Sequence, residues 1–127
     1  MSKMEWTQEA MSILTAEKLM GYKRVDHPSN TVNPTWQAPD GTVTHQVPAY
    51  ASNYQLIDSI KTIMKRNGFE YQEVPKQGGP FNEWLYAVRF VKQDESPDPE
   101  LQQTQIPRDL VPYHVCRLAL KALGFLP

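Results

Sequence analysis

The chain has 127 residues, 40% of them hydrophobic and 21% charged, which supplies enough apolar material for one packed core and excludes a wholly disordered or fibrous chain. Lys and Arg total 13 and Asp and Glu total 14, so the formal net charge is −1. Proteins that coat DNA or RNA usually carry a basic excess, and its absence here argues against a nucleic-acid polymer as partner. We expect a single domain over residues 1–127.

The cysteine content and the N-terminal sequence predict a cytoplasmic protein. Cys116 is the single cysteine, so no disulfide can form within the chain, as is typical of reducing compartments. Residues 1–6 contain no apolar signal core, and no apolar run approaches the roughly 20 residues that span a bilayer. We therefore expect no membrane partner.

The first predicted helix runs from about Thr7 to Met20. Thr7 is a suitable N-cap, apolar residues follow at helical spacing, and Gly21 stands where a left-handed residue favours the end of a helix. Residues 22–34 are polar and contain two prolines, so we expect a loop there.

A β-hairpin is predicted next, with strands at residues 36–38 and 43–47. The Pro-Asp-Gly sequence at residues 39–41 is typical of a tight turn, because proline presets the first position and glycine accepts a left-handed backbone at the third. In the register closed by this turn, Trp36 and Thr44 share one face and the valines take the other. Either both faces are covered, or Trp36 is partly exposed.

A second helix is predicted from Ser52 to about Asn67. Ser52 and Gln55 fit a capping box, and Asn67-Gly68 is a typical helix end. The apolar residues between them follow the helical period: Leu56, Ile57, Ile60, Ile63 and Met64.

Two further strands are predicted at residues 69–74 and 83–91, joined by a turn at residues 76–80. The second has the strongest strand pattern of the chain because apolar residues occupy both of its faces, with Arg89 as the exception on one of them. A strand that is apolar on both sides is usually central and covered on both sides. This pattern favours a three-layer arrangement with helices on each face of the sheet.

Residues 92–107 are acidic and proline-rich, which indicates a linker, and a last helix follows from about Asp109 to Gly124. The expected buried stripe of that helix comprises Val111, Val115, Leu118, Ala119, Ala122 and Leu123. We therefore predict an α/β (α+β) fold in the order α-β-β-α-β-β-α. Its core is a four-stranded, mainly antiparallel sheet flanked by three helices in a three-layer sandwich.

Three segments together resemble the phage ABA sandwich domain family, which comprises small proteins of phages and prophages. Residues 16–22 (AEKLMGY) are similar to a helix-end pattern of that family, residues 48–52 (PAYAS) to its entry into the second helix, and residues 115–120 (VCRLAL) to a run in its last helix. Tyr22 stands where the family often has tryptophan, and Ala51 is an insertion. The resemblance covers about residues 10–124 and implies an α/β/α layer fold and a viral origin rather than a reaction.

No motif for catalysis or metal binding stands out in the sequence. His27, His45 and His114 fall on a predicted loop, strand and helix, so no pair has the spacing of a helical metal site. Cys116 lies among apolar positions of the last helix, as a packed residue does, whereas a catalytic thiolate prefers a helix N-terminus or basic surroundings. Gly78-Gly79 lacks the lysine of a phosphate loop. We predict no catalytic residue, no metal site and no cofactor.

The residues that best suit ligand binding are aromatic, basic or placed at a predicted helix start. Flat rings can stack on a nucleobase, an arginine fork suits phosphate, and free amides at a helix start attract anions. The alternative is ordinary, since aromatic residues can close the edge of a small core while basic residues are solvated. The predicted ligand-binding residues are Tyr22, Lys23, Arg24, Trp36, Tyr50, Ser52, Asn53 and Arg117.

These observations favour a phage-encoded protein that binds a nucleotide without catalysis. The specific hypothesis is that it sequesters a signalling nucleotide, either a cyclic oligonucleotide or one of the ADP-ribose type, and so evades bacterial antiphage defence. This step is an analogy with other small phage proteins. We expect a homo-oligomer, because symmetric interfaces create pockets that a small domain lacks. The alternatives are a module that binds a host or phage protein through an edge strand or the acidic linker, and a small nucleotide hydrolase.

Overall fold

Three α-helices lie between two separate antiparallel sheets in the computed structural model, which describes residues 7–27, 30–78, 83–93 and 98–126. Sheet A has the strand order β1-β2-β3 and sheet B the order β4-β5-β6. The elements in chain order are α1 (Gln8–Lys18), β1 (Lys23–His27), β2 (Asn30–Gln37), β3 (Val43–Thr44), the 3₁₀ turn η1 (Tyr54–Leu56), α2 (Ile57–Arg66), β4 (Phe69–Gly78), β5 (Glu83–Lys92), η2 (Pro99–Leu101), β6 (Gln102–Pro107), η3 (Arg108–Leu110) and α3 (Val111–Ala122).

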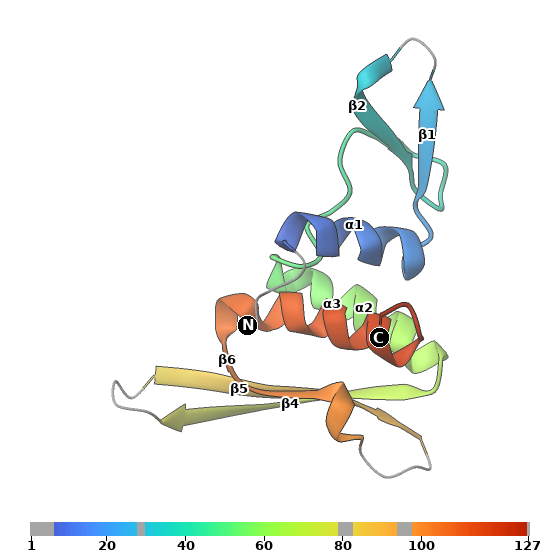
Figure 1. Cartoon of the computed structure of the whole chain (residues 1–127). Helices are drawn as coiled ribbons and strands as arrows, with labels where there is room; N and C mark the ends of the chain where they lie inside the picture. Colours follow the sequence, from blue (N-terminus) through green and yellow to red (C-terminus); the bar gives the residue numbers. More distant parts are fainter. Residues whose placement is uncertain (1–6, 28–29, 79–82, 94–97, 127) are drawn as a thin grey trace.

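The mixed α/β class is confirmed, but the predicted single four-stranded sheet and its element order are wrong. Figure 1 shows α2 and α3 on one face of sheet B, α1 on the other side of these two helices, and sheet A beyond α1. The layers are therefore sheet B, the helices and sheet A. The prediction of helices on both faces of β5 is also wrong, because both helices that contact sheet B lie on the same side.

Helix α1 forms as its sequence predicts. The Thr7 side chain accepts a hydrogen bond from the Ala10 amide at 3.0 Å, which satisfies one of the free donors at the helix start. Gly21 then takes a left-handed backbone with φ of 82°, which lets the chain leave the helix. The Tyr22 amide donates to the Ala16 carbonyl at 2.9 Å, closing the last turn.

The loop predicted at residues 22–34 is wrong, because β1 and most of β2 occupy this stretch. The pairing Lys23↔Gln37, Arg24↔Trp36 and Val25↔Thr35 joins the two strands. The sequence pattern misses them because this hairpin is held by backbone pairing and is rich in polar residues, so it has no alternating apolar face. The Pro-Asp-Gly turn that follows is confirmed: the Ala38 amide donates to the Thr42 carbonyl at 2.8 Å.

Trp36 and Thr44 are cross-strand partners, as the turn predicts. Trp36 is 4% exposed and Val43 is 56% exposed, so the tryptophan face of the hairpin is the covered one. Of the two alternatives for Trp36, neither describes the structure: the indole is covered, while on the other face Val43 is exposed and Val47, beyond the end of β3, packs against the core.

The capping box predicted at Ser52 is wrong. The Asn53 side chain, not Ser52, accepts from the Gln55 amide at 3.0 Å and caps η1, and α2 begins only at Ile57. The amides of Ser52 and Asn53 instead donate to the Ala49 carbonyl in a turn, which holds Ser52 outside the helix. The predicted helix end is confirmed, with Asn67 as C-cap and Gly68 at a φ of 88°.

Sheet B contains the longest strand pair, β4 with β5, in unbroken register from Phe69↔Lys92 to Gly78↔Glu83. Strand β4 therefore continues beyond its predicted end to Gly78, while Gly79-Pro80 of the expected turn lie outside the described residues. The predicted linker is wrong at its end, because Gln102–Pro107 form β6 against β5. Ile106 is buried within this otherwise polar strand, and Leu101 of η2, directly before it, is buried as well. Asp94 and Glu95 of the linker lie outside the described residues.

Helix α3 is buried on most of its surface. Eight of its twelve residues are buried, including the predicted positions Val111, Val115, Leu118 and Ala119. The helix lies between sheet B and α1, beside α2 (Figure 1). None of the helices within the described ranges combines the length and apolar character needed to cross a bilayer.

Strand β6 contains a strained residue, which gives a stability prediction. Gln105 is the one non-glycine residue with positive φ, 59°, among the described residues, and it lies where the β5–β6 register shifts. Since glycine adopts this backbone without steric cost, Gln105→Gly should raise the free energy of unfolding by about 0.5–1 kcal/mol. Urea denaturation measures the change. The same substitution at the exposed neighbour Thr104 should lower stability, and an equal loss at both sites would contradict the strain.

Candidate functional site

Two cavities lie side by side with Ser52 in the lining of both, and we call the pair the Ser52 groove. The larger has a volume of about 580 Å³ and is lined by Gln8, Glu9, Ser12, Ile13, Trp36, His45, Gln46, Val47, Ala49 and Ser52. The smaller has a volume of about 400 Å³ and is lined by Ser52, Tyr54, Arg108, Asp109 and Pro112. Both volumes fall in the range of roughly 300–1,000 Å³ that is typical of small-molecule sites.

The larger cavity lies between α1, Trp36 of β2 and the segment that leads from β3 toward α2. The buried Ser12 hydroxyl accepts a hydrogen bond from the Ala51 amide at 2.9 Å, which ties this segment to α1. Trp36 is almost fully covered, so it forms a wall of the cavity and not a free stacking plate. Side chains with amide or imidazole groups, Gln8, Gln46 and His45, complete the lining. An apolar wall beside hydrogen-bonding groups suits a flat polar ring.

The smaller cavity contains an exposed guanidinium stacked on a tyrosine. The Arg108 guanidinium lies 4.7 Å from the centroid of the Tyr54 ring, a cation–π distance. Arg108 forms no ion pair with a carboxylate in the part of the chain that the structure describes. A guanidinium held in this way can present its remaining donors to an anion.

A carboxylate fixes the tyrosine on which Arg108 rests. The Tyr54 hydroxyl donates to Glu73 Oε2 at 2.5 Å, and the Tyr71 hydroxyl donates to Glu73 Oε1 at 2.7 Å. Burial, with the hydrogen bond to Glu73 and its negative charge, raises the pKa of Tyr54 to about 12 and raises that of Tyr71 above its usual range. Both hydroxyls therefore stay protonated at neutral pH and keep donating to Glu73.

This network predicts a loss of stability when either tyrosine hydroxyl is removed and a change in tyrosine titration when the carboxylate is neutralised. Tyr54→Phe and Tyr71→Phe each remove one donor from Glu73 while keeping the ring, so each should lower the free energy of unfolding by about 1–2 kcal/mol in urea denaturation. Glu73→Gln should lower the pKa of Tyr54 in an ultraviolet pH titration, because it removes the negative charge beside the phenol. An unchanged tyrosine titration in Glu73→Gln would contradict the network.

The structure brings two of the sequence-predicted ligand residues into the Ser52 groove. These are Trp36 and Ser52, and Asn53 lies next to them as the cap of η1. Tyr50 and Tyr22 lie beside each other away from the groove lining, and Tyr50 is 6% exposed. Burial first, and then the neighbouring Tyr22, raise the pKa of Tyr50 above its usual range.

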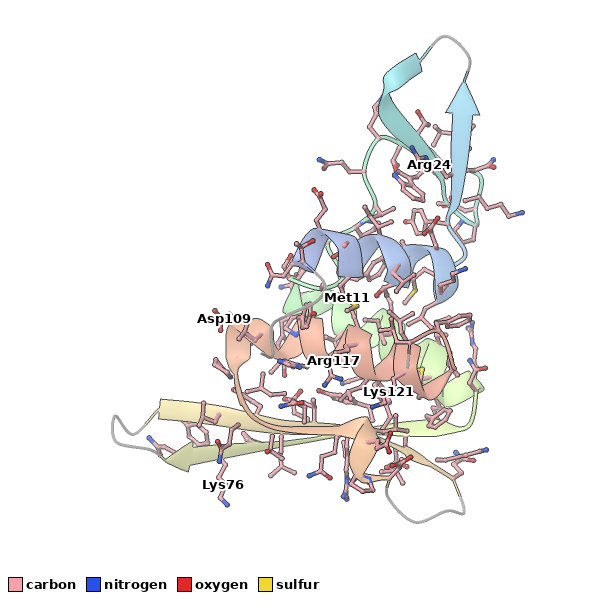
Figure 2. The ribbon with its side chains drawn as sticks, in the orientation of Figure 1. Met11, Arg24, Lys76, Asp109, Arg117 and Lys121 are labelled. Carbon is pink, nitrogen blue, oxygen red and sulfur yellow. The ribbon has the colours of Figure 1, made fainter. Side chains whose placement is uncertain are left out.

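The three basic residues of the predicted set lie outside the groove lining. Lys23 and Arg24 are exposed on β1, in the hairpin of sheet A. Arg117 points from α3 toward sheet B and donates to the side-chain oxygen of Gln103 at 3.0 Å. Figure 2 shows Arg24 and Arg117 on opposite sides of α1. The predicted aromatic and basic set is therefore divided among three places in the fold.

Sequence reasoning missed Arg108, Tyr54 and Glu73. Arg108 stacks on Tyr54, which is distant in sequence, and periodic patterns in a sequence do not reveal such a contact. The available sign was Arg108 shortly before Pro112 at the start of the last helix, because a basic residue at a helix start can reinforce anion binding by the free amides there.

No family model, curated protein or solved structure matches the chain. The resemblance to phage sandwich proteins accordingly depends on the three sequence segments alone.

Cys116, His45 and His114 share no metal site among the described residues, while the side chain of His27 lies outside them. Within those residues, no group of three His, Cys, Asp or Glu side chains is placed to hold a metal ion. Cys116 is fully buried, as the sequence predicts, and burial raises the pKa of its thiol to about 12. The thiol is therefore protonated and shielded, which is unsuitable for a nucleophile.

His114 makes folding stability depend on pH. Burial and then the positive charge of Arg117 lower the pKa of His114 to about 4, and its Nδ1 atom is buried without a hydrogen-bond partner. The unfolded imidazole takes up a proton near pH 6.5. The contribution of this group is therefore fully present above pH 6.5 and is lost as the pH falls toward 4.

We expect the melting temperature of the wild-type chain to be lower at pH 5 than at pH 7. In His114→Gln this difference should be smaller. Thermal denaturation at the two pH values gives the comparison, and the absolute stability of the variant does not affect it. The same substitution at the exposed His45 is the matched control. An equal pH dependence in wild type and His114→Gln would contradict this assignment.

Proposed function

We propose that this protein binds a phosphorylated nucleotide in the Ser52 groove without altering it chemically. The observation that carries the proposal is the position of Ser52 between two cavities of different character. The larger has an apolar wall with amide groups around it, and the smaller holds a stacked guanidinium. A nucleotide has the same division, with a flat polar base at one end and phosphate at the other.

The larger cavity supports the base end of the proposal. Trp36, Val47 and Ile13 supply apolar surface for the flat ring. Gln8 and Gln46 carry both donor and acceptor atoms, which can match the hydrogen-bonding edge of a base. Because Trp36 is a covered wall, the base contacts it at the cavity boundary and does not stack over an open indole face.

Arg108 supports the phosphate end and takes the role that the sequence suggested for Arg117. Its guanidinium is exposed, seated on Tyr54 and free of a carboxylate partner in the described ranges. Planar guanidinium groups bind phosphate oxygens with two parallel hydrogen bonds. Glu9 and Asp109 border the groove as well, so a ligand with few negative charges and several hydroxyl groups fits better than a highly charged polyphosphate.

The biological role in this proposal is sequestration of a signalling nucleotide of the cyclic or ADP-ribose type. The support for this role is the resemblance to phage sandwich proteins together with the nucleotide-shaped division of the groove. Such a phage-encoded protein would lower the free concentration of the nucleotide and so evade the host's antiphage defence.

Calorimetric titration with ADP-ribose and with a cyclic diadenylate tests the proposal. We expect one of the two to bind the wild-type chain, and Arg108→Ala to weaken that binding about 10-fold to 100-fold, because a charge-assisted phosphate contact is lost. Arg108→Lys should recover only part of the affinity, because lysine keeps the charge but not the planar fork. Mass spectrometry of the ligand released on denaturation should return it unchanged.

Two variants serve as matched controls. Arg66→Ala removes an exposed arginine at the end of α2, and Arg117→Ala removes the guanidinium under α3, so both should leave the affinity unchanged. No binding of either nucleotide, or equal losses in Arg108→Ala and Arg66→Ala, would overturn the proposed site. Release of an altered nucleotide would instead show a hydrolase.

A further inference from the structure

One face of sheet B is left uncovered by the three α-helices, and it contains both polar and apolar residues. The aromatic residues of β4 and β5 lie on the face toward α2 and α3, as the buried Phe90 and Phe69 show. Figure 2 shows Lys76 on β4 pointing away from the helices. By alternation and cross-strand register, the residues that share this outer face are Glu70, Gln72, Val74 and Lys76 of β4 and Leu85, Ala87, Arg89 and Val91 of β5.

The outer face is self-complementary about its centre, the level of the Glu73↔Val88 pair. A twofold rotation that reverses the strand direction about that level moves Glu70 to the position of Lys76, and Leu85 to the position of Val91, and the reverse. It also exchanges Ala87 with Arg89. The same rotation places Gln72 against Val74. It therefore matches one pair of opposite charges on β4, one apolar pair on β5, and the long Arg89 side chain with the small Ala87.

A twofold axis that stacks these faces with their strands aligned runs either along the strands or across them. An axis along the central strand β5 places Arg89 against Arg89 of the second copy, which brings like charges together. An axis across the strands, at the level of Glu73 and Val88, places each Glu70 against Lys76 of the second copy. The second arrangement pairs Glu70 with Lys76 and places Arg89 against the small Ala87, and each contact occurs twice because the interface is isologous.

The shape of the outer face fits the same arrangement, because the face has a hollow near its centre. A shallow hollow of about 300 Å³ is lined by Gln72, Val74, Lys76, Ala87, Val88, Arg89 and Gln102. Arg89 is held over this face by the hydrogen bond from its Nε to the Gln72 side chain, at 2.6 Å. The small Ala87 side chain leaves room for Arg89 of the second copy. Val74, 58% exposed in the single chain, becomes covered.

The edges of sheet B are less suitable for association than its face. Pro75 lies on the edge strand β4 and lacks a backbone donor, and the other edge strand, β6, has a register shift near Gln105. Prolines and bulges on edge strands are recognised means of preventing pairing with another chain. Stacking of faces avoids both obstacles.

We propose that two copies of this chain form a dimer by packing the outer faces of sheet B about a twofold axis at the level of Glu73 and Val88. The faces pack at roughly 10 Å, as in other aligned sheet pairs. Three strands of ten residues or fewer cover roughly 34 Å by 14 Å, so the interface is near the small end of specific interfaces. A weak dimer whose population depends on concentration is the expected result.

Sedimentation velocity of the full chain over a concentration series tests the proposal. Wild type should shift from monomer to dimer as concentration rises. Glu70→Lys and Lys76→Glu alone should each weaken the dimer about tenfold or more, because each turns two attractions into two repulsions. Mixing the two single variants should restore the dimer, since both contacts of the mixed pair then join a lysine to a glutamate. The double charge exchange within one chain should also restore it.

The controls are Glu17→Lys and Lys65→Glu, which reverse exposed charges on α1 and α2 and should leave dimerisation unchanged. Circular dichroism confirms that each variant is folded. A wild-type chain that stays monomeric at every concentration would overturn the proposal. A dimer that Glu70→Lys affects no more than Glu17→Lys, or one that mixing fails to restore, would overturn it equally. Nucleotide titration of the monomeric variants is independent of this result, because the Ser52 groove lies on the other side of sheet B.

Discussion

The burial of α3 is the constraint on which the rest of the structure depends. A helix that is apolar around most of its circumference needs partners on several sides, and α3 has sheet B on one side, α1 on another and α2 beside it. The small residues Ala119 and Cys116 are fully buried and allow the neighbouring elements to approach closely. The two sheets do not pack on each other, since this helical layer separates them (Figure 1). The arrangement explains why one small chain supports two separate three-stranded sheets.

The candidate binding groove combines residues of α1 and β2 with irregular segments that are attached to this rigid centre. The Ser12 hydroxyl holds the turn at Ala51 against α1, and Glu73 of sheet B holds the Tyr54 ring. Arg108, on the turn that leads into α3, then rests on that ring. The first two contacts fix a loop or turn residue to a helix or strand, and Arg108 then rests on a ring that is already held, which is how such a site gains a defined geometry. The predicted base and phosphate ends of the groove thus depend on different layers of the fold.

Sheet B has two faces with different roles. Its inner face packs aromatic rings such as Phe90 under the helices, while its outer face combines charged groups with partly buried aliphatic residues. The strand pattern at residues 83–91 was apolar on both sides, and we expected helices on both for that reason. A second copy of the chain offers another means of covering the outer face, and it would account for the apolar residues there without a further helical layer.

Local chemistry alone determined several parts of this protein. Thr7 as a cap, the Pro-Asp-Gly turn with its Trp36–Thr44 pairing, and the glycines at helix ends follow from backbone geometry within a few residues, so the sequence pattern was sufficient to predict them. Strands β1 and β6 could not be predicted in this way, because polar strands gain their stability from backbone pairing with a partner strand and not from an apolar pattern of their own. The candidate site depends even more on tertiary structure. Arg108, Tyr54 and Glu73 are distant in sequence, and only the packing of η1, β4 and the start of α3 brings a cation, a ring and a carboxylate into contact.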